Sequence, residues 1–367
     1  MRAERILPLD SLRGIAAVGV TMFWHYAHFG PYRVFEGFAA DWLYRFGLML
    51  VDFFFVLSGF VISHAYLQKL VERRVGPAQF FIARFSRLYP LHLLTFLFVA
   101  AVQFYRTNQG LDSFVYSSND LQHFFLNLAF LQQGIINTEY SYNGPAWSLT
   151  VEELSYLAFF VSVFFFATRY RLAFAGLLLL GTVINLAVWD THVFNLNISR
   201  GLVGFFTGCM AYQLHRKAFT QNRSRLLAAV VTPLLIGVVS YYVWFGYPSS
   251  GRMLLLVNSL VIFPALVLTV LNLPMLARLF SLRPVAYLGE ISYSIYMIHF
   301  PVQLVLATLD QVYFLGFSRG SVQFFLLYGA LTFALSVASY HLFERRVQAA
   351  IRSAWARRTG ERPASAS

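Results

Sequence analysis

Long apolar runs that contain few charges recur along this chain, and they constrain what it can fold into. Hydrophobic residues occupy 58% of the 367 positions and charged residues only 12%, whereas a soluble domain normally carries about 25% charged residues. A helix needs about 20 mainly apolar residues to cross a bilayer. By this measure the sequence predicts ten spans, at residues 11–29, 46–66, 86–105, 145–167, 172–189, 199–214, 226–245, 253–272, 289–309 and 321–342. We therefore expect an all-α, polytopic membrane protein.

The remaining segments predict little independent structure. Residues 121–136 are apolar but short and interrupted, which is more typical of a re-entrant or interfacial helix than of a span. We expect residues 1–344 to form one membrane domain. The basic residues 345–367 should form a disordered cytoplasmic tail, because they are small, polar and charged.

The distribution of basic residues predicts the orientation of the chain. An even number of spans places both termini on the same side, and a cytoplasmic N-terminus puts 22 of the 28 Lys and Arg residues in the cytoplasm. The other six are Arg33, Arg45, Arg106, Arg200, Arg252 and Arg319. This asymmetry follows the positive-inside rule, so we expect both termini in the cytoplasm of a cell that carries the protein in its plasma (inner) membrane.

The net charge and the cysteine content exclude other classes of protein. The positive-inside rule explains the net charge of +12 without a nucleic-acid partner. We therefore expect the protein to be surrounded by membrane lipids. The single cysteine, Cys209, excludes a disulfide within the chain and a cysteine-based metal site. We expect no metal ion and no bound cofactor.

Two histidines lie in the second half of the first predicted span. Thr21, His25 and His28 are spaced i, i+4, i+7 and would share one face of an α-helix. Ionisable residues inside a membrane are costly and commonly mark a functional site. The alternative is a histidine near the far interface that only bonds to a neighbouring helix.

Arginines gather at the predicted cytoplasmic end of two spans. Arg84 and Arg87 are three residues apart on one helix face, and Arg13 begins the first span at the same depth. Guanidinium groups bind phosphates through paired hydrogen bonds, so these residues could hold a phosphorylated cytoplasmic ligand. They could equally anchor the helices by extending into the lipid headgroups.

Adjacent acidic residues, Glu152 and Glu153, occupy the fourth predicted span. Ser148 and Glu152 share a helix face, whereas Glu153 points about 100° away. At ~1.5 Å per residue, Glu152 and His25 reach similar depths in a core of ~30 Å. The sequence therefore predicts that Glu152 orients a neutral His25, which acts as a general base.

Small residues in two other spans predict close helix packing. Ser58 and Gly59 lie in the second span, and Gly204 and Gly208 form a small-xxx-small pair in the sixth. Such residues let helices approach closely in lipid, and we interpret all four as packing residues.

Five motifs resemble, in order, those of the acyltransferase 3 family. They are Leu-Asp-Ser-Leu-Arg-Gly-Ile-Ala-Ala at 9–17, Phe-Phe-Val-Leu-Ser-Gly-Phe at 54–60, Arg-x-x-Arg-Leu-Tyr-Pro at 84–90, Trp-Ser-Leu-x-Val-Glu-Glu at 147–153 and Tyr-Ser-Ile-Tyr-Met-Ile-His-x-Pro at 293–301. This family comprises integral membrane acyltransferases, including O-antigen and other polysaccharide O-acetyltransferases. Each motif alone is weak, but together they extend over most of the chain.

The resemblance implies an enzyme of ten helices that moves an acyl group, usually acetyl, from cytoplasmic acyl-CoA to a hydroxyl group. The acceptor would be an extracytoplasmic glycan or a lipid-linked saccharide, and acyl-CoA would be a co-substrate. By position, the catalytic residues would be His25, Glu152 and Ser148, and the donor-binding residues Arg13, Arg84 and Arg87. Supporting residues would be Asp10, Trp147, Glu153, His28 and His299. Direct transfer and a covalent acyl-enzyme on a histidine or Ser148 both remain open.

One spacing departs from the family pattern. Ten residues commonly separate the arginine of the first helix from the histidine, but eleven separate Arg13 from His25, and Trp24 stands at the usual position. Either a local bulge absorbs the extra residue or His28 shares the catalytic role. We favour His25 because aromatic residues flank it.

Two other functions fit parts of the pattern. A proton-coupled transporter of an anionic or sugar-like solute could use the histidine, glutamate and arginines as a relay, but it would usually show internal repeats and broken helices, which we do not find. A membrane scaffold without a site would poorly explain the paired glutamates. The sequence does not predict the acceptor, the acyl chain length or the oligomeric state.

Overall fold

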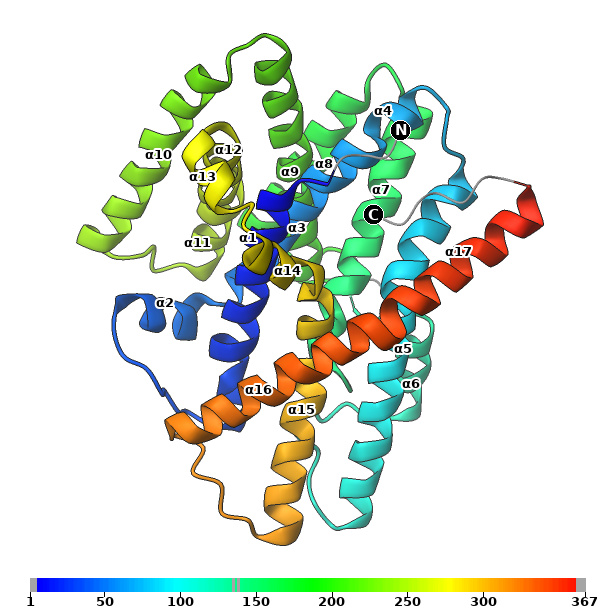
Figure 1. Cartoon of the computed structure of the whole chain (residues 1–367), viewed down its shortest axis with the longest axis vertical. Coiled ribbons are helices and arrows are strands. Elements are labelled where there is room, and N and C mark those ends of the chain that lie inside the picture. The colour runs from blue at the N-terminus through cyan, green and yellow to red at the C-terminus, as the bar shows by residue number, and fades with distance from the viewer. Residues whose placement is uncertain (1–4, 134–135, 137–138, 361–367) are drawn as a thin grey trace.

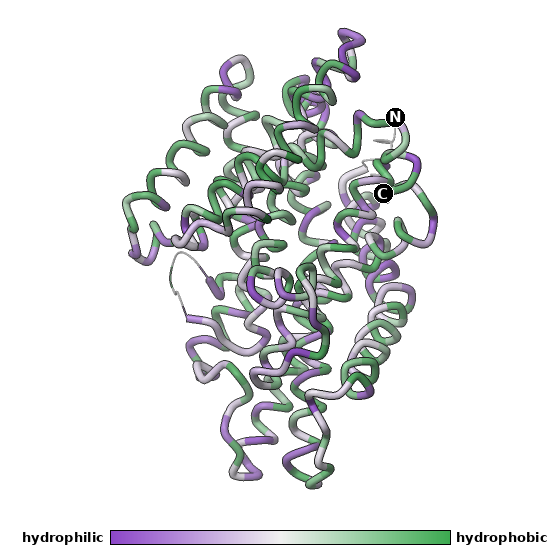
Figure 2. The backbone as a smooth tube through the Cα atoms, turned by 90° about the vertical axis from the view of Figure 1, so that its left-hand side faces the viewer, coloured by the Kyte–Doolittle hydropathy of each residue, from purple (hydrophilic) through white to green (hydrophobic). Residues whose placement is uncertain are grey.

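The protein is a bundle of helices. A computed structural model describes residues 5–133, 136 and 139–360, and all regular structure among them is helical. Most of the long helices run between two ends of the molecule (Figure 1), and hydrophilic residues gather at the turns, whereas the helices are largely hydrophobic (Figure 2). This pattern is expected of a bundle surrounded by lipid.

The first half of the chain forms α1 (Leu7–Gly19), η1 (Val20–Trp24), η2 (His25–Phe29), α2 (Phe38–Phe46), α3 (Met49–Ile62), η3 (Ser63–Leu67), α4 (Gln68–Val71), α5 (Pro77–Asn108), α6 (Leu121–Leu128), η4 (Gly144–Ala146), α7 (Trp147–Phe165) and α8 (Tyr170–Leu186). The second half forms α9 (Leu196–Thr220), α10 (Ser224–Phe245), α11 (Gly251–Val257), η5 (Asn258–Ile262), α12 (Phe263–Asn272), α13 (Pro274–Leu279), α14 (Arg283–Glu290), α15 (Ser292–Tyr313), α16 (Val322–Ser339), η6 (Tyr340–Glu344) and α17 (Arg345–Thr359).

The helices coincide with the predicted spans. Seven helical stretches within the described residues are long and apolar enough to cross a membrane: 49–71, 77–108, 144–165, 224–245, 251–272, 292–313 and 322–359. The other three predicted spans fall on α1 to η2, on α8 and on α9. A multi-pass, all-α membrane protein is thus confirmed, whereas the total of ten crossings and the cytoplasmic termini stay predictions.

The first helix changes its winding just before the histidines. After α1 the chain forms a π-helical turn, Val20–Trp24, and then a 3₁₀ turn, His25–Phe29, which ends at Gly30 with φ 132°. A π-helical turn takes up an extra residue in an α-helix and occurs frequently at functional sites. The bulge expected from the spacing of Arg13 and His25 is therefore present, and the α-helical face predicted for Thr21, His25 and His28 is not maintained.

Helices α3 and α9 pack backbone to backbone. A Cβ atom on Gly208 would come 2.0 Å from the carbonyl oxygen of Val56, and one on Gly59 would come 1.9 Å from that of Phe205. Only glycine permits this approach. The packing role predicted for these glycines is confirmed, and the contact fixes α3, which carries Ser58 into the site described below.

The C-terminal segment is structured where we expected disorder. Residues 345–359 form α17, which continues α16 and η6 and packs against α5 (Figure 1). The prediction of a disordered tail is wrong for this part, because Arg352 and Ala356 are buried against the bundle. Residues 361–367 of the predicted tail lie outside the described residues. The segment predicted as a short, non-spanning helix contains α6.

Candidate functional site

His25 is held by a histidine from another helix. His25 Nδ1 lies 2.8 Å from His299 Nε2, and the rings stack with centroids 4.7 Å apart. His299 Nδ1 lies 2.6 Å from the backbone oxygen of Tyr296, which can only accept a hydrogen bond. His299 must therefore donate from Nδ1 and accept at Nε2, so His25 donates from Nδ1. In a neutral His25 the lone pair consequently lies on Nε2.

Gln303 fixes the second histidine in the same way. Its Nε2 donates to the backbone oxygen of His25 at 2.8 Å, so its Oε1, 2.9 Å from His28 Nδ1, accepts from that nitrogen. His28 Nε2 is then the acceptor for the hydroxyl of Tyr116, at 3.4 Å. His25 Nε2 has no hydrogen-bond partner among the described residues. Of the two histidines, His25 thus presents the free basic nitrogen.

A cavity lies beside these histidines, between α1, α3, α5, α7 and α15. It encloses about 700 Å³ of space free of atoms, including the part that opens to solvent. Its lining includes the three predicted donor-binding arginines, Arg13, Arg84 and Arg87, together with Ser148 and Glu152. The structure therefore brings together residues that are up to 283 positions apart in the sequence (from 13 to 296).

Tyr296 connects this cavity with the histidines. Its side chain lines the cavity, where its hydroxyl donates to the backbone oxygen of Pro145 at 2.8 Å and accepts from Ser148 Oγ at 3.2 Å. Its ring centroid is 6.5 Å from that of His25, and its backbone oxygen anchors His299. One residue thus contacts both the cavity and the histidine pair.

Glu152 does not pair with His25, which corrects the prediction from depth. Its Oε1 accepts hydrogen bonds from the hydroxyls of Ser58 and Tyr156, each at 2.5 Å. The partner that orients His25 is instead His299 on α15. Ser58, interpreted from sequence as a packing residue, instead contributes its hydroxyl to the cavity.

The arginines differ in how firmly they are held. Arg84 is buried, and its Nη2 donates to the hydroxyl of Tyr66 at 3.2 Å, whereas its buried Nε has no partner among the described residues. Arg13 lies 3.9 Å from Asp10, a weak ion pair. The cavity therefore contains guanidinium donors that the described protein atoms do not saturate.

Two further predicted residues, Trp147 and Glu153, flank Ser148 and Glu152 in the sequence but do not line the cavity. The indole of Trp147 packs under the guanidinium of Arg200, whose Cζ is 4.7 Å from the ring centroid, and Arg200 Nε donates to buried Asp52 at 2.8 Å. This contact fixes the start of α7 and hence Ser148. Glu153 does not line the cavity, as the helix periodicity predicts, and its Oε1 is buried without a partner in the described part of the chain.

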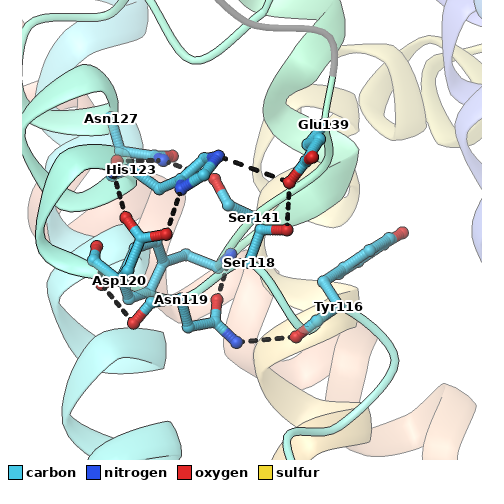
Figure 3. A network of polar contacts seen from close by, with 9 residues as sticks. Tyr116, Ser118, Asn119, Asp120, His123, Asn127, Glu139 and Ser141 are labelled. Carbon is cyan, nitrogen blue, oxygen red and sulfur yellow. Dashed lines mark hydrogen bonds and ion pairs between the residues drawn. The ribbon is translucent and has the colours of Figure 1, made fainter.

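Polar contacts hold together the segment between α5 and α7, which contains α6 and carries Tyr116 (Figure 3). Its Tyr116 reaches His28, and the segment itself is held by His123, which bonds to Asp120 at 2.8 Å and lies 3.7 Å from Glu139. Hydrogen bonds from the His123 amide and ring hold the pKa of the exposed Asp120 carboxyl below its usual range. This segment therefore places Tyr116 against His28.

The sequence analysis named His299 of α15 as a supporting residue but missed its neighbours Tyr296 and Gln303, and it did not predict that His299 orients His25. Tyr296, His299 and Gln303 are spaced i, i+3, i+7, so they share one face of the helix. This polar stripe in an apolar span was visible in the sequence, although its partners on the first helix were not. Among the described residues no cluster of His, Cys, Asp and Glu could hold a metal ion.

Comparisons with known proteins show which family the chain is similar to. A family model described as an acyltransferase domain matches residues 6–341. The O-acetyltransferase OatA of Staphylococcus aureus is 23% identical over 338 residues, covering 82% of this chain and 51% of the relative. The acyltransferase MdmB of Streptomyces mycarofaciens is 29% identical over 162 residues, covering 43% and 39% of the two chains. A protein encoded in the picA locus of Rhizobium radiobacter is 41% identical over 98 residues, covering 27% and 46%.

The chain spans about half the length of the curated relatives it matches, or less. No solved structure matches it. Because the family model covers almost the whole membrane bundle, including both histidine helices and every wall of the cavity, this chain belongs to the acyltransferase 3 family of membrane acyltransferases.

Proposed function

We propose that this protein is a cell-membrane O-acetyltransferase that transfers acetyl from cytoplasmic acetyl-CoA to a hydroxyl of an extracytoplasmic glycan or lipid-linked saccharide. One observation carries the proposal: an arginine-lined cavity reaches Tyr296, whose ring centroid is 6.5 Å from that of His25 and whose backbone oxygen anchors the histidine that bonds to His25. The arginines could bind phosphates at one end of the cavity, and His25 could act as a base near the other end. Such a site suits acyl-CoA, in which the charged nucleotide is far from the thioester. The family and the names of its relatives support acyl transfer.

The donor would enter from the arginine side. Arg84 and Arg87 provide fork-shaped donors for the phosphates of CoA, and Arg13 lines the same cavity. The pantetheine arm would then extend along the apolar wall toward Ser148 and Tyr296. In this placement the thioester carbonyl would lie beside Tyr296, near His25.

The transfer step requires a base for the acceptor hydroxyl. His25 Nε2 takes the hydroxyl proton while the oxygen attacks the thioester carbon and forms the new C–O bond. The C–S bond then breaks, and the proton passes from His25 to the departing thiolate, giving an ester and CoA with a free thiol. His299 accepts from Nδ1–H throughout, so it stabilises the imidazolium formed in this step.

Direct transfer suits this geometry better than an acyl-serine. Ser148 Oγ donates to Tyr296 and lies 3.4 Å from the backbone oxygen of Pro145. None of these contacts can remove its proton and activate it as a nucleophile. The acceptor would approach His25 from the side of the segment that carries Tyr116.

Radiolabelled acetyl-CoA tests the proposal. Membranes containing the protein are incubated with donor labelled in the acetyl group, and the glycan and lipid fractions are separated, with membranes lacking the protein as control. We expect label, released by mild base as acetate, in a saccharide fraction only when the protein is present. Equal labelling in both membranes would refute the proposed reaction, and label in lipid without saccharide would refute the acceptor class.

A further inference from the structure

The C-terminal helix adds a fourth arginine, which does not itself line the cavity but interacts electrostatically with Arg84 and Arg87 of its wall. Arg352 on α17 is 9% exposed, and its Nε donates to Ser86 Oγ while its Nη2 donates to the backbone oxygen of Ala83, both at 3.2 Å. Ser86 lies between Arg84 and Arg87 in the sequence of α5. Arg352 is therefore fixed on the same helical turn as two of the predicted donor-binding residues (Figure 1 shows α17 beside α5).

Positive charge gathers around this turn of α5 without a carboxylate in direct contact. Arg84, Arg87 and Arg352 interact electrostatically, and none of the three forms an ion pair with a carboxylate among the described residues. Tyr66 interacts electrostatically with Arg352 and accepts a hydrogen bond from Arg84, and its ring faces a further cation, Lys69 Nζ, at 5.6 Å.

Holding like charges together in a poorly hydrated place is costly unless an anion joins them. Glu153 interacts electrostatically with Arg84, and Glu344 with Arg87, but neither carboxylate lies within ion-pair distance of its arginine. Arg352 keeps Nη1 without a hydrogen-bond partner in the described part of the chain. The cluster thus has spare donors for a ligand that carries several negative charges.

We propose that Arg352 belongs to the donor site and binds a phosphate of the CoA nucleotide, so that α17 is part of the functional unit. The inference rests on the proposed function, and it concerns a residue beyond the region 6–341 that the family model covers. CoA carries a diphosphate and a separate 3′-phosphate, so two separate phosphate groups need cationic partners. Beside Arg13, Arg84 and Arg87, a fourth guanidinium from α17 supplies an additional contact.

The test distinguishes phosphate binding by Arg352 from a purely structural role in holding α17 against α5. Arg352→Gln keeps an N–H donor for Ala83 but loses the charge, and Arg357→Gln on the exposed face of α17 is the matched control. Affinities of the purified full chain for CoA and for pantetheine, which has no phosphate, are measured by titration calorimetry. Because a hydrogen bond to a charged group is lost, Arg352→Gln should weaken CoA binding by about tenfold or more.

Pantetheine binding and the control variant should be unchanged. Equal weakening of both ligands, or unchanged CoA affinity in the folded variant, would overturn the assignment. If Arg352→Gln does not fold, Arg352→Lys serves instead; it keeps the charge but loses the fork, and it should bind CoA more weakly with pantetheine unaffected. Wild-type protein that binds CoA no better than pantetheine would refute the proposed donor itself, whatever the variants do.

Discussion

Replacing His299 by Leu should slow the chemical step without weakening donor binding. His299 Nε2 accepts the Nδ1–H of His25 at 2.8 Å, and this bond leaves His25 Nε2 as the base. Leu fills much of the space but accepts no hydrogen bond. His25 then has a buried unpaired donor, or it changes tautomer and points its proton at the acceptor hydroxyl.

The size of the effect follows from that lost bond. Leaving a buried donor unsatisfied costs about 1–3 kcal/mol, which corresponds to roughly a 5- to 150-fold decrease in kcat. His299→Gln offers a carbonyl oxygen that can accept from His25 Nδ1, so it should retain more activity than His299→Leu. A structural role alone would not distinguish these two variants in this order.

The assay is release of CoA thiol by purified protein at saturating acetyl-CoA and acceptor, with donor affinity and thermal stability measured in parallel. We expect kcat to fall in the order wild type, His299→Gln, His299→Leu, at similar donor affinity. Wild-type kcat in a folded His299→Leu variant would refute the orienting role. Loss of donor affinity together with kcat would show that the change disturbs the cavity instead.

Further predictions concern the cavity and the scaffold. Glu152→Gln should lower turnover more than Glu153→Gln in the same thiol assay, because only Glu152 lines the cavity and bonds to its hydroxyls; the reverse order would contradict this assignment. Arg200→Ala should destabilise the protein by about 3–5 kcal/mol, because it leaves the Asp52 carboxylate buried and unpaired; chemical unfolding measures this, and an unchanged midpoint would argue against it. Gly208→Ala should lower thermal stability because a Cβ atom there meets a backbone oxygen of α3, and a normal melting temperature would show that α3 and α9 can separate. A periplasm-active reporter fused after residue 367 should stay silent, since 22 of 28 basic residues favour cytoplasmic termini; activity would reverse the topology.

The sequence predicted the helices well because each span is a local property. About 20 apolar residues in a row are sufficient to locate a helix in lipid, and every predicted span falls on one. The glycines of α3 and α9 were also informative, since close packing needs small residues wherever the helices meet. The extra residue before His25 predicted a bulge as one of two explanations, and the π-helical turn provides it.

The pairing of side chains was less predictable. Depth arguments place His25 and Glu152 at one level, but they do not fix how each helix is rotated or which third helix lies between them. The partner of His25 comes from α15, 274 residues away. The prediction of a disordered tail was wrong for a related reason. Composition favours disorder in residues 345–359, but burial of Arg352 and Ala356 against the bundle stabilises a helix there.

Substitution of the two histidines of the first helix tests the central claim most directly. His25→Ala and His28→Ala are compared in purified protein for acetyl transfer and for acetyl-CoA binding. The account predicts that His25→Ala loses transfer by about 10²- to 10⁴-fold, as expected for a general base, and still binds the donor, whereas His28→Ala retains measurable transfer. An active His25→Ala variant beside an inactive His28→Ala variant would contradict the account and place the base one helical turn further along the chain.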